Sequence, residues 1–211
     1  MSIPEIWQQF VKGMQRTTWL EYVAVFTGIG RVWFSRKESI LTYPIGLINT
    51  TSYIYISFNY HLFGEACVNL YYTIMSIYGW YMWRKRNDRE EHVLHITYSD
   101  KKMWLYQLAF FVAFYFAIYF SLVYLKEMFF PGAIPWADAF ASAAAFTGMW
   151  LMTRKKVESW IWWIITNIAS IPLYFVKGLV FTSVYYFILL VFAFWGFAEW
   201  KKRAKNNKVA T

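Results

Sequence analysis

Two tryptophans and an asparagine stand at helical spacing in one long apolar stretch. Trp160, Trp163 and Asn167 occupy positions i, i+3 and i+7, which places them on one face of a helix over roughly 10 Å of its axis. Indole rings offer flat π surfaces, and the amide offers a hydrogen-bond donor and acceptor. This face predicts a binding site for a flat heterocycle with a polar substituent, preferably a cationic one. The alternative is an interfacial tryptophan belt, most of all for Trp160.

An earlier apolar stretch carries a corresponding polar face. Gly46, Asn49 and Tyr53 again stand at i, i+3 and i+7, just after Tyr43-Pro44. Asn49 either joins the site or only hydrogen-bonds a neighbouring helix. Pro44 and Pro172, which lie in corresponding stretches of the two halves of the chain, are expected to interrupt their helices and to act as hinges around the site.

A third stretch has a polar and aromatic stripe at helical spacing. Asn69, Tyr72, Ser76 and Trp80 follow this stripe, and Trp83 at its end precedes Arg84 and is expected to anchor the helix at the membrane interface. The predicted substrate-binding residues are therefore Trp160, Trp163, Asn167, Asn49, Asn69, Tyr53, Tyr72, Ser76 and Trp80.

Residues for catalysis or metal binding are scarce. His92 and His95 form an H-x-x-H pair, but no further histidine or carboxylate completes a metal set at a sensible spacing. The sequence has no G-x-S-x-G, P-loop or G-x-G-x-x-G pattern. We therefore expect no enzymatic activity, no metal and no cofactor.

Composition indicates that the aromatic and polar faces lie within a membrane. The 211 residues are 59% hydrophobic and 16% charged, whereas soluble domains are about 45–50% apolar and about 25% charged. A transmembrane helix needs about 20 mainly apolar residues. Seven stretches fit, approximately over 18–35, 40–60, 66–83, 103–125, 136–153, 160–179 and 181–200. The sequence thus predicts an all-α integral membrane protein with seven transmembrane helices.

Lysine and arginine are distributed unequally between the two sides of the predicted membrane. Sixteen of the 21 fall on the side of the loop 84–102 and the tail 201–211, four fall on the other side, and Arg31 lies inside the first span. Because cytoplasmic loops carry the excess, segment 1–17 is expected outside and the C-terminus in the cytoplasm. The formal net charge of +9 follows this topology, so we expect no nucleic-acid partner.

Charged residues inside the spans lie near the span ends. Glu21 is near the outer end of the first span, and Arg31 is nearer its cytoplasmic end and is expected to extend to the membrane surface. Asp138 and Glu199 are also close to span ends. A carboxylate that couples transport to protons is expected near the midplane, so the sequence favours uncoupled, facilitated passage.

The two halves of the chain resemble each other. Gly79 to Arg86, GWYMWRKR, faces Gly196 to Arg203, GFAEWKKR, at an offset of 117; Phe26-Thr27-Gly28 faces Phe146-Thr147-Gly148 and Glu38-Ser39 faces Glu158-Ser159, both at 120. Each half contains three spans in the same order, so the span 103–125 must cross between them. This predicts two parallel three-helix bundles, 18–83 and 136–200, joined by a linker helix (3+1+3), with the solute site at their interface.

The W-x-x-W-x-x-x-N run that ends at Asn167, together with Gly79-Trp80-Tyr81-x-Trp83, resembles the PnuC family of vitamin transporters over about residues 18–203. Members of this family are similar to enlarged SWEET sugar transporters, and they pass nicotinamide riboside, or in relatives thiamine or riboflavin, across the cell inner membrane by facilitated diffusion. The resemblance further implies that a cytoplasmic kinase traps the solute by phosphorylation and that the transporter is a homotrimer.

Two departures from the family pattern leave the substrate open. Asn69 stands where members that carry nicotinamide riboside often have glutamine, and Tyr43-Pro44 stands where they tend to have Trp-Pro. Because asparagine is one methylene shorter than glutamine, thiamine or riboflavin stays an alternative to nicotinamide riboside. A membrane scaffold or sensor, whose aromatic stripes only pack, is the alternative from a different class.

Overall fold

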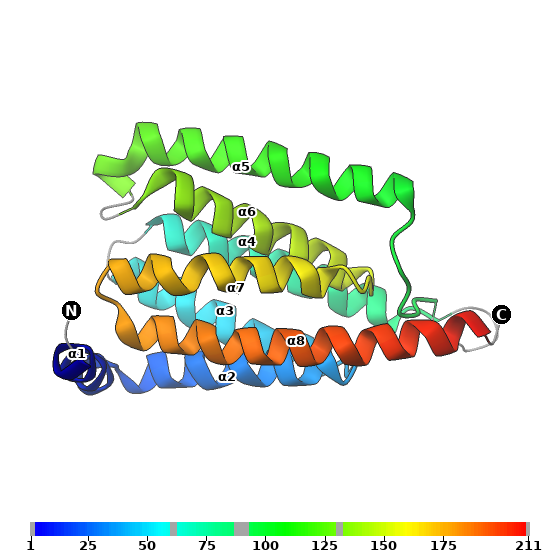
Figure 1. Cartoon of the computed structure of the whole chain (residues 1–211), viewed down its shortest axis with the longest axis horizontal. Helices are drawn as coiled ribbons and strands as arrows, with labels where there is room; N and C mark the ends of the chain where they lie inside the picture. The colour runs from blue at the N-terminus through cyan, green and yellow to red at the C-terminus, as the bar shows by residue number, and fades with distance from the viewer. Residues whose placement is uncertain (1–2, 60–62, 87–92, 130–132, 210–211) are drawn as a thin grey trace.

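The structure is a computed structural model that describes residues 3–59, 63–86, 93–129 and 133–209. These parts are mainly helical, and an isolated parallel β-bridge pairs Thr97 with Lys156. The helices are α1 (Ile3–Arg16), α2 (Trp19–Arg36), α3 (Thr42–Asn59), α4 (Phe63–Arg84), α5 (Lys101–Phe129), α6 (Pro135–Thr153), α7 (Ser159–Val176) and α8 (Val180–Val209). Figure 1 shows α2 to α8 lying side by side along one direction, with α1 seen end-on.

The seven predicted apolar stretches coincide with α2 to α8 to within a few residues, except that α8 continues to Val209. The amphipathic helix α1 lies in the segment 1–17, for which no secondary structure was predicted. Of the H-x-x-H pair, His92 lies outside the described residues.

Six of the helices form a closed ring. α3 packs between α2 and α4, and α7 packs between α6 and α8. The ring closes where α2 packs on α8 and where α4 packs on α6, while α5 lies against α6. We call the end of the ring where α2, α4, α6 and α8 begin the N-terminal end, and the opposite end the C-terminal end.

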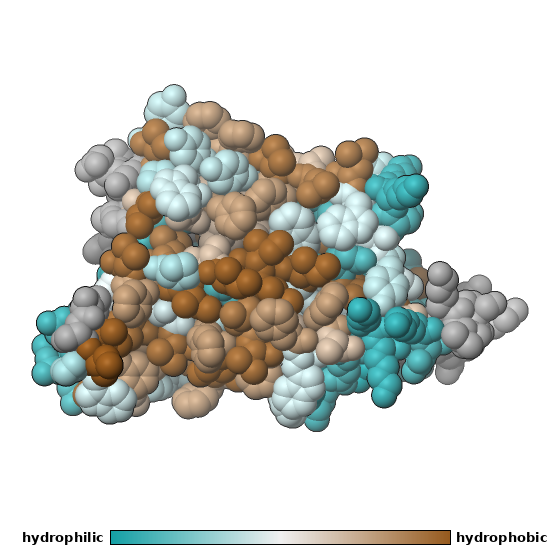
Figure 2. All heavy atoms as spheres, in the orientation of Figure 1, coloured by the Kyte–Doolittle hydropathy of each residue, from teal (hydrophilic) through white to brown (hydrophobic). Residues whose placement is uncertain are grey.

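The surface of the bundle is apolar along its length. Large hydrophobic side chains that are about half exposed follow α5 and α8, among them Phe116, Phe120, Val191 and Phe194. Figure 2 shows this apolar surface across the middle of the molecule and hydrophilic residues gathered near the C-terminal end. By length and composition, α5, α7 and α8 could each cross a membrane. The helices α2, α3, α4 and α6 are 18 to 22 residues long, and several of their polar residues face the inside of the bundle.

Local signals fix where the helices begin. Thr18 caps α2, because its hydroxyl accepts from the Glu21 backbone N–H at 3.3 Å while the Glu21 carboxylate accepts from the Thr18 N–H at 2.6 Å. Pro44 lies in the first turn of α3, where no intrahelical donor is needed, so the predicted interruption at this proline is wrong. Pro172 is inside α7, and the predicted pair of hinges is therefore reduced to one candidate.

Candidate functional site

The ring of helices encloses a cavity of about 470 Å³. This volume lies within the range of about 300–1,000 Å³ that is usual for small-molecule sites. All six ring helices contribute to its lining, which includes Glu21, Arg31, Asn49, Tyr53, Glu65, Asn69, Tyr72, Asp138, Trp160, Trp163, Asn167, Tyr185 and Tyr186. The cavity reaches the N-terminal end, where Glu21 and Asp138 lie in the first turns of α2 and α6.

Seven of the nine predicted binding residues line the cavity: Asn49, Tyr53, Asn69, Tyr72, Trp160, Trp163 and Asn167. Ser76 and Trp80 do not belong to this lining. Ser76 is fully buried, with no hydrogen-bond partner for its hydroxyl in the described structure. Trp80 packs against a core cluster that contains Tyr43 and Trp83. The stripe on α4 is thus divided, because only its first half lies at the level of the cavity.

The three asparagines of the cavity differ in their hydrogen bonds. Asn49 Nδ2 donates to the Ala24 carbonyl of α2 at 2.6 Å, which is a bond to a neighbouring helix, and Asn49 also lines the cavity. Asn69 Nδ2 donates to the Glu65 carbonyl of its own helix at 2.9 Å. No described residue hydrogen-bonds the side chain of Asn167, which is 3% exposed and faces the cavity. Asn167 therefore keeps both its donor and its acceptor for a ligand.

Aromatic rings form one wall of the cavity. Tyr72 lies 6.3 Å from Trp163 between ring centroids, and 5.8 Å from Phe146 in an edge-on arrangement. Tyr71 stacks on Phe146 with a ring-centroid distance of 4.0 Å, and its hydroxyl donates to the Phe146 carbonyl at 3.0 Å. These contacts join α4 to α6 and α7, and they hold the Trp163 and Tyr72 rings in fixed positions beside the cavity.

Arg31 is a cavity residue that the sequence analysis placed wrongly. Instead of extending to the membrane surface, its guanidinium lies 5.8 Å from the Tyr72 ring centroid, and Nη2 donates to the Met149 sulfur at 2.6 Å. Because Arg31 lies near one end of α2, its side chain was expected to point out of the bundle. Packing against α3 instead directs the side chain inward. Tyr185 and Tyr186 of α8 were also missed, since they lie in an aromatic run without a polar stripe.

Trp160 lies at the C-terminal end of the cavity and is 1% exposed. Its ring lies directly on Gly196 of α8, where a Cβ would come within 2.5 Å of it. Tyr43 lies in the same way on Gly79 of α4. Both aromatic residues and both glycines are separated by 117 positions, so the two halves of the chain repeat one packing arrangement.

Beyond Trp160, two further tryptophans close the C-terminal end. Trp200 Nε1 donates to the carbonyls of Ser35 and Arg36 at the end of α2, each at 3.1 Å. Trp83 Nε1 donates to the Met152 carbonyl at the end of α6 at 3.3 Å. Trp83 is 3% exposed, so its predicted role as an interfacial anchor is wrong. The bond from Trp200 to Ser35 and the bond from Trp83 to Met152 correspond at an offset of 117, and each connects one half of the chain to the other.

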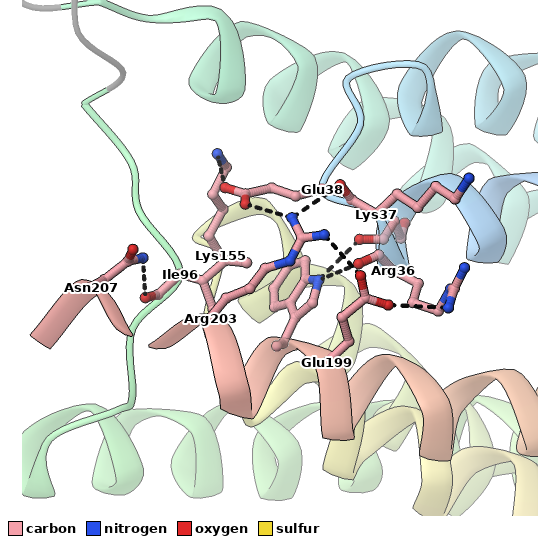
Figure 3. A network of polar contacts seen from close by, with 10 residues as sticks. Arg36, Lys37, Glu38, Ile96, Lys155, Glu199, Arg203 and Asn207 are labelled. Carbon is pink, nitrogen blue, oxygen red and sulfur yellow. Dashed lines mark hydrogen bonds and ion pairs between the residues drawn. The ribbon is translucent and has the colours of Figure 1, made fainter. Parts of the chain in front are cut away.

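An ion-pair network covers this closure (Figure 3). Glu199 pairs with Arg36 at 3.1 Å and with Arg203 at 2.8 Å. Glu38 pairs with Arg203 at 3.3 Å and with Lys155 at 2.6 Å. The network joins the end of α2 and the loop after it to α8 and to the loop between α6 and α7.

Glu38 and Lys155 occupy equivalent places in two loops of equal length. Both have left-handed backbone conformations, with φ of 59° and 51°. Each is the second residue after its helix, α2 or α6, and the two are 117 positions apart. The matching of Glu38-Ser39 with Glu158-Ser159 is therefore wrong. Glu158 instead accepts hydrogen bonds from the Ser99 N–H at 3.0 Å and from its hydroxyl at 2.7 Å.

The chain is similar over most of its length to known transport proteins. A family model described as nicotinamide mononucleotide transporter matches residues 18–202. The nicotinamide riboside transporter PnuC of Escherichia coli (strain K12) is 27% identical, over 90% of this chain and 88% of that protein.

Two further similarities concern substrate and fold. The riboflavin/roseoflavin transporter RibM of Streptomyces davaonensis is 24% identical, over 95% of this chain and 92% of that protein. The crystal structure of the vitamin B3 transporter PnuC superposes with a TM-score of 0.70 at 26% identity, and the match covers 97% of this chain and 90% of that one.

Proposed function

We propose that this chain, which belongs to the nicotinamide mononucleotide transporter family, carries nicotinamide riboside across the membrane. The observation that carries the proposal is the cavity inside the ring, with Trp163 and Tyr72 along one wall and the unpartnered amide of Asn167 beside them. A cationic pyridinium ring gains about 0.5–2 kcal/mol from each well-placed aromatic face, and the amide can bond its polar substituent.

The proposed architecture has seven spans, with α2–α4 and α6–α8 as parallel three-helix bundles and α5 as the linker helix. Two observations support it. The six helices pack in a closed ring, and Tyr43 packs on Gly79 in the first half in the same way as Trp160 packs on Gly196 in the second. Parallel repeats with the solute site between them are a known design of transporters.

We place the N-terminus outside and the C-terminus in the cytoplasm of a cell whose inner membrane holds the protein. The charge asymmetry of the loops supports this orientation. The cavity would then be reached from outside and closed towards the cytoplasm by the tryptophans and the ion-pair network. Transport requires this closure to open while the N-terminal end shuts.

Passage is proposed to be facilitated diffusion without ion coupling. The carboxylates of the cavity, Glu21, Glu65 and Asp138, all lie in the first turns of their helices and not at mid-depth. Net uptake then depends on a cytoplasmic kinase that phosphorylates the solute, and assembly as a homotrimer is part of the same proposal. Riboflavin is the second candidate substrate, favoured by the similarity to RibM.

Uptake into liposomes that contain only this protein tests the proposal. Labelled nicotinamide riboside should enter until its concentrations inside and outside are equal, and Trp163→Ala should reduce this uptake strongly. The control variant is Trp136→Ala, which alters a tryptophan that is 65% exposed at the start of α6. Parallel assays with riboflavin and thiamine rank the substrates. A scaffold or sensor would give no flux of any of the three, and this result would reject the transporter.

A further inference from the structure

Arg31 places a positive charge in the cavity at the level of the aromatic wall. Its side chain lies over Gly46 of α3, where a Cβ would come within 3.0 Å of Arg31 Cδ. The missing side chain at Gly46 therefore leaves room for Arg31 to cross α3 towards Tyr72 and Met149.

The guanidinium has no strong acceptor in the described structure. None of the five ion pairs includes Arg31, and its one side-chain hydrogen bond goes to the sulfur of Met149, which is a weak acceptor. Glu21 on the same helix is ten residues away, roughly 15 Å along the axis. Since an arginine inside a span costs at least about 2.5–3.5 kcal/mol, the remaining N–H donors of Arg31, which have no hydrogen-bond partner among the described residues, indicate a ligand group.

The position of Arg31 indicates which part of a ligand it meets. Tyr72 is near both Arg31 and Trp163. Its ring centroid is 5.8 Å from the guanidinium and 6.3 Å from the centroid of the indole. A flat ring that rests against Trp163 and Tyr72 would thus point one edge at Arg31. At this edge, an oxygen atom on the ring is the best hydrogen-bond acceptor for the guanidinium of Arg31.

We propose that Arg31 determines substrate specificity by donating hydrogen bonds to a carbonyl oxygen on the heterocycle. The inference rests on the proposed function, in which the ligand is nicotinamide riboside. Its carboxamide stands meta to the charged ring nitrogen, so the guanidinium meets the oxygen and not the positive nitrogen. Riboflavin also presents ring carbonyls. Thiamine is a cation without a carbonyl, so Arg31 repels it and disfavours it as a substrate.

A double-mutant cycle between protein and ligand tests the contact. Calorimetry in detergent would compare nicotinamide riboside with pyridinium riboside, which lacks the carboxamide, on the wild type and on Arg31→Met. A hydrogen bond to a charged group is expected to make nicotinamide riboside bind the wild type about ten- to a hundredfold more tightly than pyridinium riboside. On Arg31→Met the difference between the two affinities should shrink to no more than the about two- to tenfold expected from the Asn167 amide, and thiamine should bind more tightly than it binds the wild type. The matched control is Arg84→Met, at an exposed residue at the end of α4, which should keep the wild-type difference.

The outcomes separate the specificity proposal from the function proposal. Equal binding of both ribosides by the wild type would refute the role of Arg31, and this result needs no variant to fold. An equal loss for both ribosides in Arg31→Met would assign Arg31 to packing and also refute its role. If the wild type binds neither riboside, it is the proposed function that fails.

Discussion

Asn49 and Asn167 show how two residues of one type divide between structure and ligand binding. Both line the cavity, but Asn49 already donates to the Ala24 carbonyl of α2, whereas Asn167 has no partner among the described residues. The sequence predicted both positions because amides inside apolar spans are costly. It could not show which amide was engaged, because that depends on the distance between α2 and α3.

This division predicts different effects of alanine at the two positions. Asn49→Ala removes an interhelical hydrogen bond and should lower the free energy of unfolding by about 0.6–1.7 kcal/mol, measured by thermal unfolding in detergent. Asn167→Ala should leave that stability unchanged and weaken nicotinamide riboside binding by about two- to tenfold, measured by calorimetry. Unchanged binding together with a loss of stability in Asn167→Ala would assign this residue to helix packing.

At the scale of elements, the helices were predictable and the contacts between their ends were not. Long apolar runs between charged residues located α2 to α8. A tryptophan followed by arginine, as at Trp83, has the same sequence pattern whether it faces lipid or donates to the Met152 carbonyl of another helix. Likewise Tyr43-Pro44 indicated a bend, but the start of α3 at Thr42 makes Pro44 a first-turn residue. Tertiary packing decides both cases.

The aromatic residues that lie on glycines predict how sensitive the C-terminal end is to small changes. In Gly196→Ala the new Cβ would lie within 2.5 Å of the Trp160 ring, and overpacking of this kind typically costs about 1–3 kcal/mol. The melting temperature should fall, and Trp160 should be displaced at the end of the cavity. Gly30→Ala is the matched control, because its Cβ would make an ordinary contact of 3.6 Å with Ile45. Equal melting temperatures for the two variants would contradict the observed packing.

For the whole molecule, the ion pairs and tryptophan bonds of the C-terminal end hold the two halves together on one side only. Among the described residues, the ion pair at the N-terminal end, Lys177 with Asp138 at 2.7 Å, joins α6 to the end of α7 within one half. The cavity is accordingly closed at one end and reaches the other. This asymmetry of contacts is what a carrier needs if it exposes its site to one side at a time.

Weakening the C-terminal closure should shift the protein towards the opposite state. In Glu38→Lys the new side chain repels Lys155 and Arg203. A cysteine introduced at Ser35, a cavity residue that is 4% exposed, should then react faster with an impermeant maleimide added on the side of the membrane that the C-terminal end of the ring faces. The background is Cys67→Ser, which removes the native cysteine. The double exchange Glu38→Lys with Lys155→Glu should slow the reaction again, though only in part, because the introduced lysine still faces Arg203.

The control for this measurement is Asp138→Asn, which removes the ion pair at the other end. It should leave the rate of labelling from the side of the C-terminal end unchanged. If all variants react at the wild-type rate, the network does not keep this side closed.

The contact between Glu38 and Lys155 has a consequence for how such a protein could arise. Equivalent residues of the two halves meet here with opposite charges. Two identical copies of one half would bring the same residue to this point twice, as two glutamates or as two lysines, and they would repel each other. One repeated segment cannot encode this ion pair, so if the two halves arose by duplication, the pair dates from after their sequences diverged.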